Sequence, residues 1–195
     1  FVQSSVNSFD HVLVEGNCAA ANADPLVYDM MAAFYTACSS FIAQNFGARK
    51  KKRILQTYLI CLFYSFITSL VLGVGLYLAR YPFLYLFTSD KAVVEAGITR
   101  LSIMALSYSA SAFMDASIAA SRGLGKTAVP TFVVVMGSCV FRIIWIYTIF
   151  AYFHTIQSLY ILYVFSWGIT AIAENIYFFH VYRHTLTGKT ESHLK

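Results

Sequence analysis

The sequence predicts an all-α integral membrane protein, and two observations lead to this fold class. Of the 195 residues, 58% are hydrophobic and only 12% are charged, whereas a soluble domain is usually about one quarter charged. The apolar residues also come in long runs, since residues 54–79, 127–141 and 143–173 contain no Asp, Glu, Lys or Arg. A helix needs about 20 mostly apolar residues to cross a bilayer. We therefore expect a polytopic bundle of five complete transmembrane helices plus the end of a sixth.

The elements follow in order along the chain. The end of a helix is expected over about residues 1–14, with boundaries good to a few residues. Complete spans are expected over residues 26–47, 54–79, 97–121, 128–152 and 157–182. The 26–47 span begins near Asp24-Pro25, because proline suits the first turn of a helix. Residues 1–183 thus form one helical unit, 184–195 form a polar tail, and the start without Met indicates a segment of a longer chain.

Lys and Arg in the short loops predict the orientation. The loops near 49–53 and 122–126, and the tail after 183, hold most of the basic residues, so this side is expected to be cytoplasmic. The opposite side carries Arg80, Lys91 and Arg100. The run RKKKR has three interpretations, a nucleic-acid patch, an anionic-lipid site or a topology anchor. The anchor is favoured, and with it a multi-pass plasma-membrane protein (inner membrane if bacterial), in contact with lipid and not with nucleic acid.

The stretch SRGLGKT, residues 121–127, ends like a nucleotide-binding P-loop. The complete pattern needs a glycine five residues before the glycine of GKT, and that position is Ala120. The stretch also follows a predicted helix rather than a strand. An ATP-driven function is therefore disfavoured.

Two acidic residues lie inside predicted spans, where a charge is costly and usually faces a cavity or a partner. Asp115 ends a polar stripe at helical spacing, formed with Ser107, Tyr108 and Ser111. Such a stripe suits a cation, a proton or a hydrogen-bonding substrate, although small residues also serve helix packing. Glu174 ends an aromatic stripe formed by Tyr160, Tyr163, Trp167 and Thr170 and continued by Tyr177. An aromatic wall suits flat cations, and the alternative is an interfacial aromatic belt.

Three further polar residues lie at membrane depth. Arg142 needs a partner, so an ion pair with Glu174 or Asp115, or a clamp on backbone carbonyls, is expected. Gln3 and Asn7 share one helix face and either bridge helices or line a cavity. The histidines and cysteines show no ligand spacing, so no metal site or cofactor is expected.

Several motifs resemble the multidrug and toxic compound extrusion family. SSFIAQNFGARKKKRIL is similar to that family's helix-end motif, and FMDASIAASRGLGKTAVP is similar to its pattern of an aspartate followed by R-G-x-G-x-T, here Asp115, Arg122, Gly123, Gly125 and Thr127. FVQSSVNSF resembles the later half of the first helix of the C-terminal lobe. The resemblance extends over nearly the whole chain.

The resemblance implies a transporter of two six-helix lobes, of which this chain is most of the second and lacks the N-terminal lobe. It implies export of drugs or organic cations in exchange for Na⁺ or H⁺, with Asp115 coupling to the ion and Gln3 and Asn7 lining the cavity. Lys126 replaces an acidic residue that often follows the last glycine of the motif. A lipid-linked oligosaccharide flippase of the same superfamily is the alternative, and a membrane-embedded enzyme is disfavoured because no catalytic cluster is present in the sequence.

Overall fold

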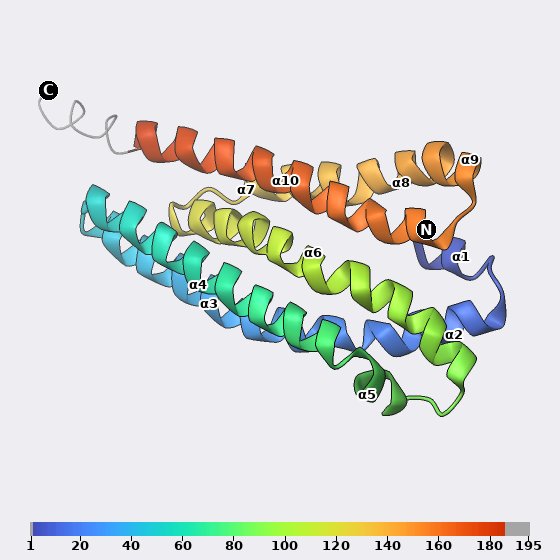
Figure 1. Ribbon diagram of the computed structural model, residues 1–195. Coiled ribbons are helices and arrows are strands. Elements are labelled where there is room, and N and C mark those ends of the chain that lie inside the picture. The colour runs from blue at the N-terminus through green and yellow to red at the C-terminus, as the bar shows by residue number, and fades with distance from the viewer. Residues whose placement is uncertain (1, 186–195) are drawn as a thin grey trace, which may run out of the picture.

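The computed structural model describes residues 2–185, apart from the side chains of Gln3, Ser4, Leu106 and Thr185. Long helices run antiparallel to one another and form a bundle (Figure 1). The helices are α1 (Val2–Val6), α2 (His11–Ala21), α3 (Ala23–Gly47), α4 (Lys51–Leu78), α5 (Arg80–Tyr85), α6 (Lys91–Gly123), α7 (Ala128–Val135), η1 (Met136–Val140), α8 (Phe141–Trp145), η2 (Ile146–Phe150), α9 (Ala151–Phe153) and α10 (Ile156–Thr185).

Five stretches of the described chain have the length and composition of membrane spans. Four are His11–Gly47, Lys51–Leu78, Ala128–Phe153 and Ile156–His184. The fifth is α6, whose two halves meet at a bend of 42°. Since α1 supplies only a short helix before the first of these spans, the expected arrangement of five complete spans and the end of a sixth is confirmed.

The expected end of a helix over residues 1–14, followed by a connection to the 26–47 span, is wrong, because α1 ends at Val6 and residues 11–21 are helical. α2 runs from His11 to Ala21 and is separated from α3 by Asn22 alone. The three alanines at 19–21 are strong helix formers, and one face of α2 is buried against α6. A Cβ added to Gly16 would lie 2.7 Å from the backbone of α6, so the two helices touch backbone to backbone. Packing therefore extends the helix far beyond its predicted start.

Pro25 explains why the long helix is interrupted at Asn22. A proline has no N–H to donate to the carbonyl four residues earlier, and its ring crowds that carbonyl. Within the break, the side chain of Asn22 donates to the carbonyls of Cys18 and Ala19 in the last turn of α2, at 3.1 Å each. The end of α2 is thus capped from within the break.

The other spans lie close to their predicted positions, with two differences. α6 begins at Lys91 rather than near residue 97, because Asp90 caps it by accepting a hydrogen bond from the Ala92 N–H at 2.9 Å. The short helix α5, Arg80–Tyr85, occupies a segment that was expected to be a connection.

α6 is the central helix of the bundle and contacts α2, α3, α4, α5 and α10. Three buried clusters lie along it. One joins it to α3, α4 and α10 around Tyr58 and Phe178, a second surrounds Tyr108 and Trp167, and a third packs α2 and α5 around Leu84. A residue of α6 can therefore contact several helices at once.

Figure 1 shows that the α3–α4 turn, the α6–α7 turn and the end of α10 lie at the same end of the bundle. We call this the basic end, because Arg49, Lys50, Lys51 and Lys126 lie in or beside its turns. α1, α5 and α9 lie at the opposite end.

Gly73 of α4 generates a packing prediction. A Cβ at this position would lie 2.0 Å from the carbonyl oxygen of Ala105 on α6, whereas a Cβ at Gly75 would meet nothing within 4 Å. Because backbone atoms cannot yield easily, we expect Gly73→Ala to lower the free energy of unfolding by about 1–3 kcal/mol. Thermal unfolding in detergent measures the effect, with Gly75→Ala as the matched control. Equal melting temperatures for the two variants would contradict the close α4–α6 contact.

Candidate functional site

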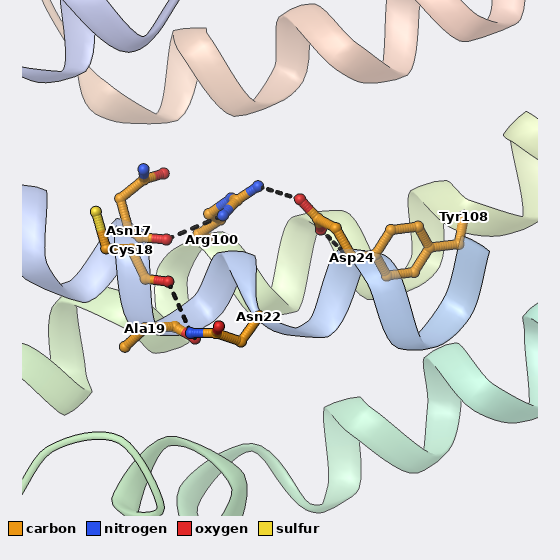
Figure 2. Close-up of polar contacts among 7 residues, drawn as sticks. All are labelled: Asn17, Cys18, Ala19, Asn22, Asp24, Arg100 and Tyr108. Atoms are coloured by element: carbon orange, nitrogen blue, oxygen red, sulfur yellow. Dashed lines mark hydrogen bonds and ion pairs between the residues drawn. The ribbon is translucent and has the colours of Figure 1, made fainter. Parts of the chain in front are cut away.

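An ion pair between a buried arginine and a partly exposed aspartate joins the α2–α3 break to α6 (Figure 2). Arg100 is 7% exposed, and its Nη2 lies 2.6 Å from Oδ2 of Asp24. Its Nη1 donates to the carbonyl of Asn17 on α2 at 2.9 Å. One guanidinium group therefore holds residues on both sides of the break.

The other carboxylate oxygen of Asp24 accepts a hydrogen bond from the hydroxyl of Tyr108. The network thus runs from α2 through Arg100 and Asp24 to a fully buried tyrosine on α6. Tyr108 was predicted from its stripe, but Asp24 and Arg100 were not, since they were interpreted as a helix start and a loop charge. The signal was present, because Arg100, Met104 and Tyr108 follow one another at steps of four.

Tyr108 belongs to a cluster of four aromatic rings, which we call the aromatic cluster and define as Tyr28, Tyr108, Tyr163 and Trp167. The centroids of Tyr28 lie 5.9 Å from Tyr108 and 6.2 Å from Trp167, both edge to face. Trp167 also lies 6.4 Å from Tyr108 and 5.7 Å from Tyr163. The cluster joins α3, α6 and α10, and Tyr28 and Tyr163 remain partly exposed. Ring faces of this kind attract cations.

Asp115 lies on α6 beyond the aromatic cluster, toward the basic end. It is partly exposed, and its carboxyl group forms no hydrogen bond or ion pair with the residues that the structure describes. The hydroxyls of Tyr28 and Tyr35 and the charge of Arg122 lie within electrostatic range of it. Its carboxyl oxygens are thus free of hydrogen bonds to the described residues, in a region where phenols and a guanidinium contribute to the electrostatic field.

Glu174 on α10 is completely buried, with 0% of its surface exposed. Neither carboxyl oxygen has a hydrogen-bond partner among the described residues, although Arg122 again lies within electrostatic range. A buried polar group without a partner costs free energy and needs an explanation, such as an ion, a proton or a water at that place.

Arg142 does not form the expected ion pair with Glu174 or Asp115. In the part of the chain that the structure describes, its Nε donates to Oγ of Ser166 at 3.3 Å, and its guanidinium lies 4.4 Å from the ring centroid of Tyr163. A planar guanidinium stacks well on a ring face, so an aromatic partner takes the place of a carboxylate.

Of the remaining predicted site residues, Ser111 lies near the aromatic cluster and Asn7 does not. Ser111 is buried on α6 and donates to the carbonyl of Tyr108 at 2.9 Å, so its hydroxyl is satisfied locally. Asn7 is exposed just after α1, near the opposite end. The side chain of Gln3 and the tail over 186–195 lie outside the described residues.

A comparison with protein families gives one match, in which the MatE model covers residues 6–148. The chain belongs to the MatE family. The matched range includes α2 to α6 and most of the following span, and therefore Asp24, Arg100, Asp115 and Arg142. No curated protein matches the chain.

Solved transporter structures share this MatE fold. The Vibrio cholerae MATE transporter VcmN in its bent form has a TM-score of 0.82 and 19% identity, over 92% of this chain and 41% of that one. A mutant of VcmN has a TM-score of 0.84 and 19% identity, over 94% of this chain and 42% of that one. A MOP superfamily transporter from Pyrococcus furiosus has a TM-score of 0.83 and 18% identity, over 95% of this chain and 41% of that one. Its binding pocket is described as having reverse polarity. This chain therefore spans about two fifths of their length and has the fold of one transporter lobe.

The stretch SRGLGKT forms a turn in this MatE lobe. The N–H of Lys126 donates to the carbonyl of Ser121 at 3.0 Å, and that of Gly125 donates to Arg122 at 2.9 Å. Gly125 has a φ of 76°, the left-handed conformation that glycine adopts at little cost. The stretch is the C-terminal cap of α6, which turns the chain toward α7.

The buried pair of Asp24 and Arg100 generates the prediction of this subsection. Asp24→Asn leaves the guanidinium of Arg100 buried without a counter-charge, so we expect the free energy of unfolding to fall by about 3–5 kcal/mol. Thermal unfolding in detergent measures it. Glu15→Gln is the matched control, because it breaks an exposed pair with His11 and is expected to change stability by less than about 1 kcal/mol. Similar melting temperatures for the two variants would show that the buried pair contributes little.

Proposed function

We propose that this chain is part of a secondary active transporter that exports organic cations, such as drugs and other xenobiotics, by cation-coupled antiport with alternating access. The observation that carries the proposal is the pair of acidic groups Asp115 and Glu174, which have no hydrogen-bond or ion-pair partner among the described residues and follow Tyr108 and Trp167 of the aromatic cluster on α6 and α10. A transporter needs acidic groups that exchange an ion or a proton, and intramembrane acids commonly mark such pathways. A proton relay or a Na⁺ site can both use a carboxyl group, so either ion fits. The proposed role is transport rather than catalysis.

The balance of charges supports cationic cargo. Asp24 already neutralises Arg100, which leaves Arg142 as a cation against Asp115 and Glu174 as acids in the interior of the described bundle. The ring faces of the aromatic cluster add attraction for a flat cation. The full-length protein would supply the other lobe, and the cargo site would lie between the lobes.

A lipid-linked oligosaccharide flippase is the alternative, and one observation favours it. Arg142 has no carboxylate partner among the described residues, so it would attract a phosphate. The similarity to the Pyrococcus furiosus transporter, whose binding pocket is described as having reverse polarity that suggests a different function, is consistent with this alternative. The surplus of acids over free cations makes this the second choice here.

Replacing the proposed coupling acid tests the function. In the full-length transporter, we expect Asp115→Asn to abolish efflux driven by a Na⁺ or pH gradient, because an amide cannot exchange a proton and binds Na⁺ poorly. Glu174→Gln is expected to weaken the coupling in the same direction. Efflux of a fluorescent organic cation from proteoliposomes measures both.

The matched control is Asp29→Asn, since Asp29 is an exposed acid on α3. The Asp29→Asn protein should transport normally. Undiminished gradient-driven efflux by correctly inserted Asp115→Asn protein would remove Asp115 from the coupling role. Gradient-driven movement of lipid-linked sugars, without movement of cations, would select the flippase.

The orientation is proposed from the distribution of basic residues. The basic end of the bundle would face the cytoplasm of a plasma membrane, or of the inner membrane in a bacterium, because Lys and Arg are retained on that side. A protease added to intact cells should therefore spare a tag at the C-terminus and remove it only after permeabilisation. Cleavage of the tag in intact cells would reverse the orientation.

A further inference from the structure

Arg142 is bound by contacts that are easy to exchange. Its hydrogen bond to Ser166 is long, at 3.3 Å, and its other contact is the ring face of Tyr163 at 4.4 Å. The guanidinium also lies within electrostatic range of the hydroxyl of Tyr28. A planar organic cation would seek the same contacts, namely a ring face and nearby hydroxyl groups. The side chain of Arg142 therefore shows where and how a cation binds to the aromatic cluster.

Arg100 provides the contrast. Its guanidinium is buried, donates to a carbonyl and contacts a carboxylate at 2.6 Å. Removing Arg100 from these partners would leave the charge of Asp24 unpaired inside the protein, which is expensive. Moving Arg142 away from Tyr163 leaves no carboxylate behind. Of these two interior arginines, Arg142 is the one that can leave.

The helix that carries Arg142 is unusual in the same place. α8 has only five residues, and π-helical segments, η1 (Met136–Val140) and η2 (Ile146–Phe150), lie on both sides of it. π-helical turns are rare and occur often at functional sites. None of the residues of α8 is buried. Arg142 is thus held on a helix segment that other elements constrain little.

We propose that Arg142 is a tethered cation that occupies the binding face of Tyr163, and that a planar organic cation takes its place when cargo binds. This inference rests on the proposed function and goes beyond it, since it assigns Tyr163 as the cargo subsite and Arg142 as an internal competitor. The guanidinium fills the ring face in the absence of cargo and moves off it as the cargo enters.

The experiment measures the affinity of the purified full-length transporter for ethidium, a planar cation, by equilibrium dialysis. Arg142→Gln removes the competitor, so the Kd is expected to fall by about 2- to 10-fold, the range of one cation–π contact. Ser166→Ala loosens Arg142 without removing its charge and should lower the Kd by a smaller factor. Tyr163→Leu removes the ring and should raise the Kd, and in the double variant with Arg142→Gln the gain should disappear.

Arg80→Gln is the matched control. Arg80 lies 4.6 Å from the ring of Tyr77 and 5.4 Å from that of Tyr81, which is the same type of contact outside the aromatic cluster, and its replacement should leave the Kd unchanged. If the parent binds ethidium and neither Arg142→Gln nor Ser166→Ala binds it more tightly, the inference is overturned while the proposed function stands. If the parent and all variants bind no ethidium, cationic cargo is rejected as well.

Discussion

The contact between Arg100 and Asp24 links three helix segments, because one guanidinium group on α6 binds the carbonyl of Asn17 on α2 and the carboxylate of Asp24 on α3. Arg100 lies in the first third of α6 and reaches both α2 and the first turn of α3. It adds a polar link to the apolar contacts by which both of these helices already pack on α6. Tyr108 then connects the pair to the aromatic cluster. The ion pair is thus linked, through Tyr108 and Trp167, to the proposed cargo subsite at Tyr163.

Pro25 explains why such an anchor is needed. It removes a backbone donor from a helix that would otherwise continue from His11 to Gly47, and the break exposes carbonyl oxygens at the end of α2. The protein satisfies two of these oxygens with the side chain of Asn22, and Arg100 donates to the carbonyl of Asn17 one turn earlier in α2. The break and the ion pair therefore lie side by side at the junction of α2 and α3.

The interior charges of this lobe are held in three ways, and each way suits a different task. Arg100 is fixed by a carboxylate and a carbonyl, which suits a structural anchor. Arg142 is held by a ring face and one long hydrogen bond, which suits a side chain that is displaced when a cation binds, as proposed above. Asp115 and Glu174 have no hydrogen-bond partner among the described residues, and an acid in that condition suits the exchange of an ion. The strength of the partner thus separates the structural anchor from the groups that are proposed to act in transport.

The amino-acid sequence determined the fold class, the number of spans, the turn at SRGLGKT and the interior location of Asp115, Glu174 and Arg142. These follow from local composition and helical period, which act over a few turns of helix. Only the tertiary structure decided that residues 15–21 are helical, that Asp24 pairs with Arg100, and that Arg142 contacts Tyr163 rather than an acid. Each of these depends on which helices lie beside α6 and α10. The hydrophobic period of one segment predicts its buried face but does not predict which distant segment packs against that face. The sequence therefore identified the interior charges, and the packing of helices chose their partners.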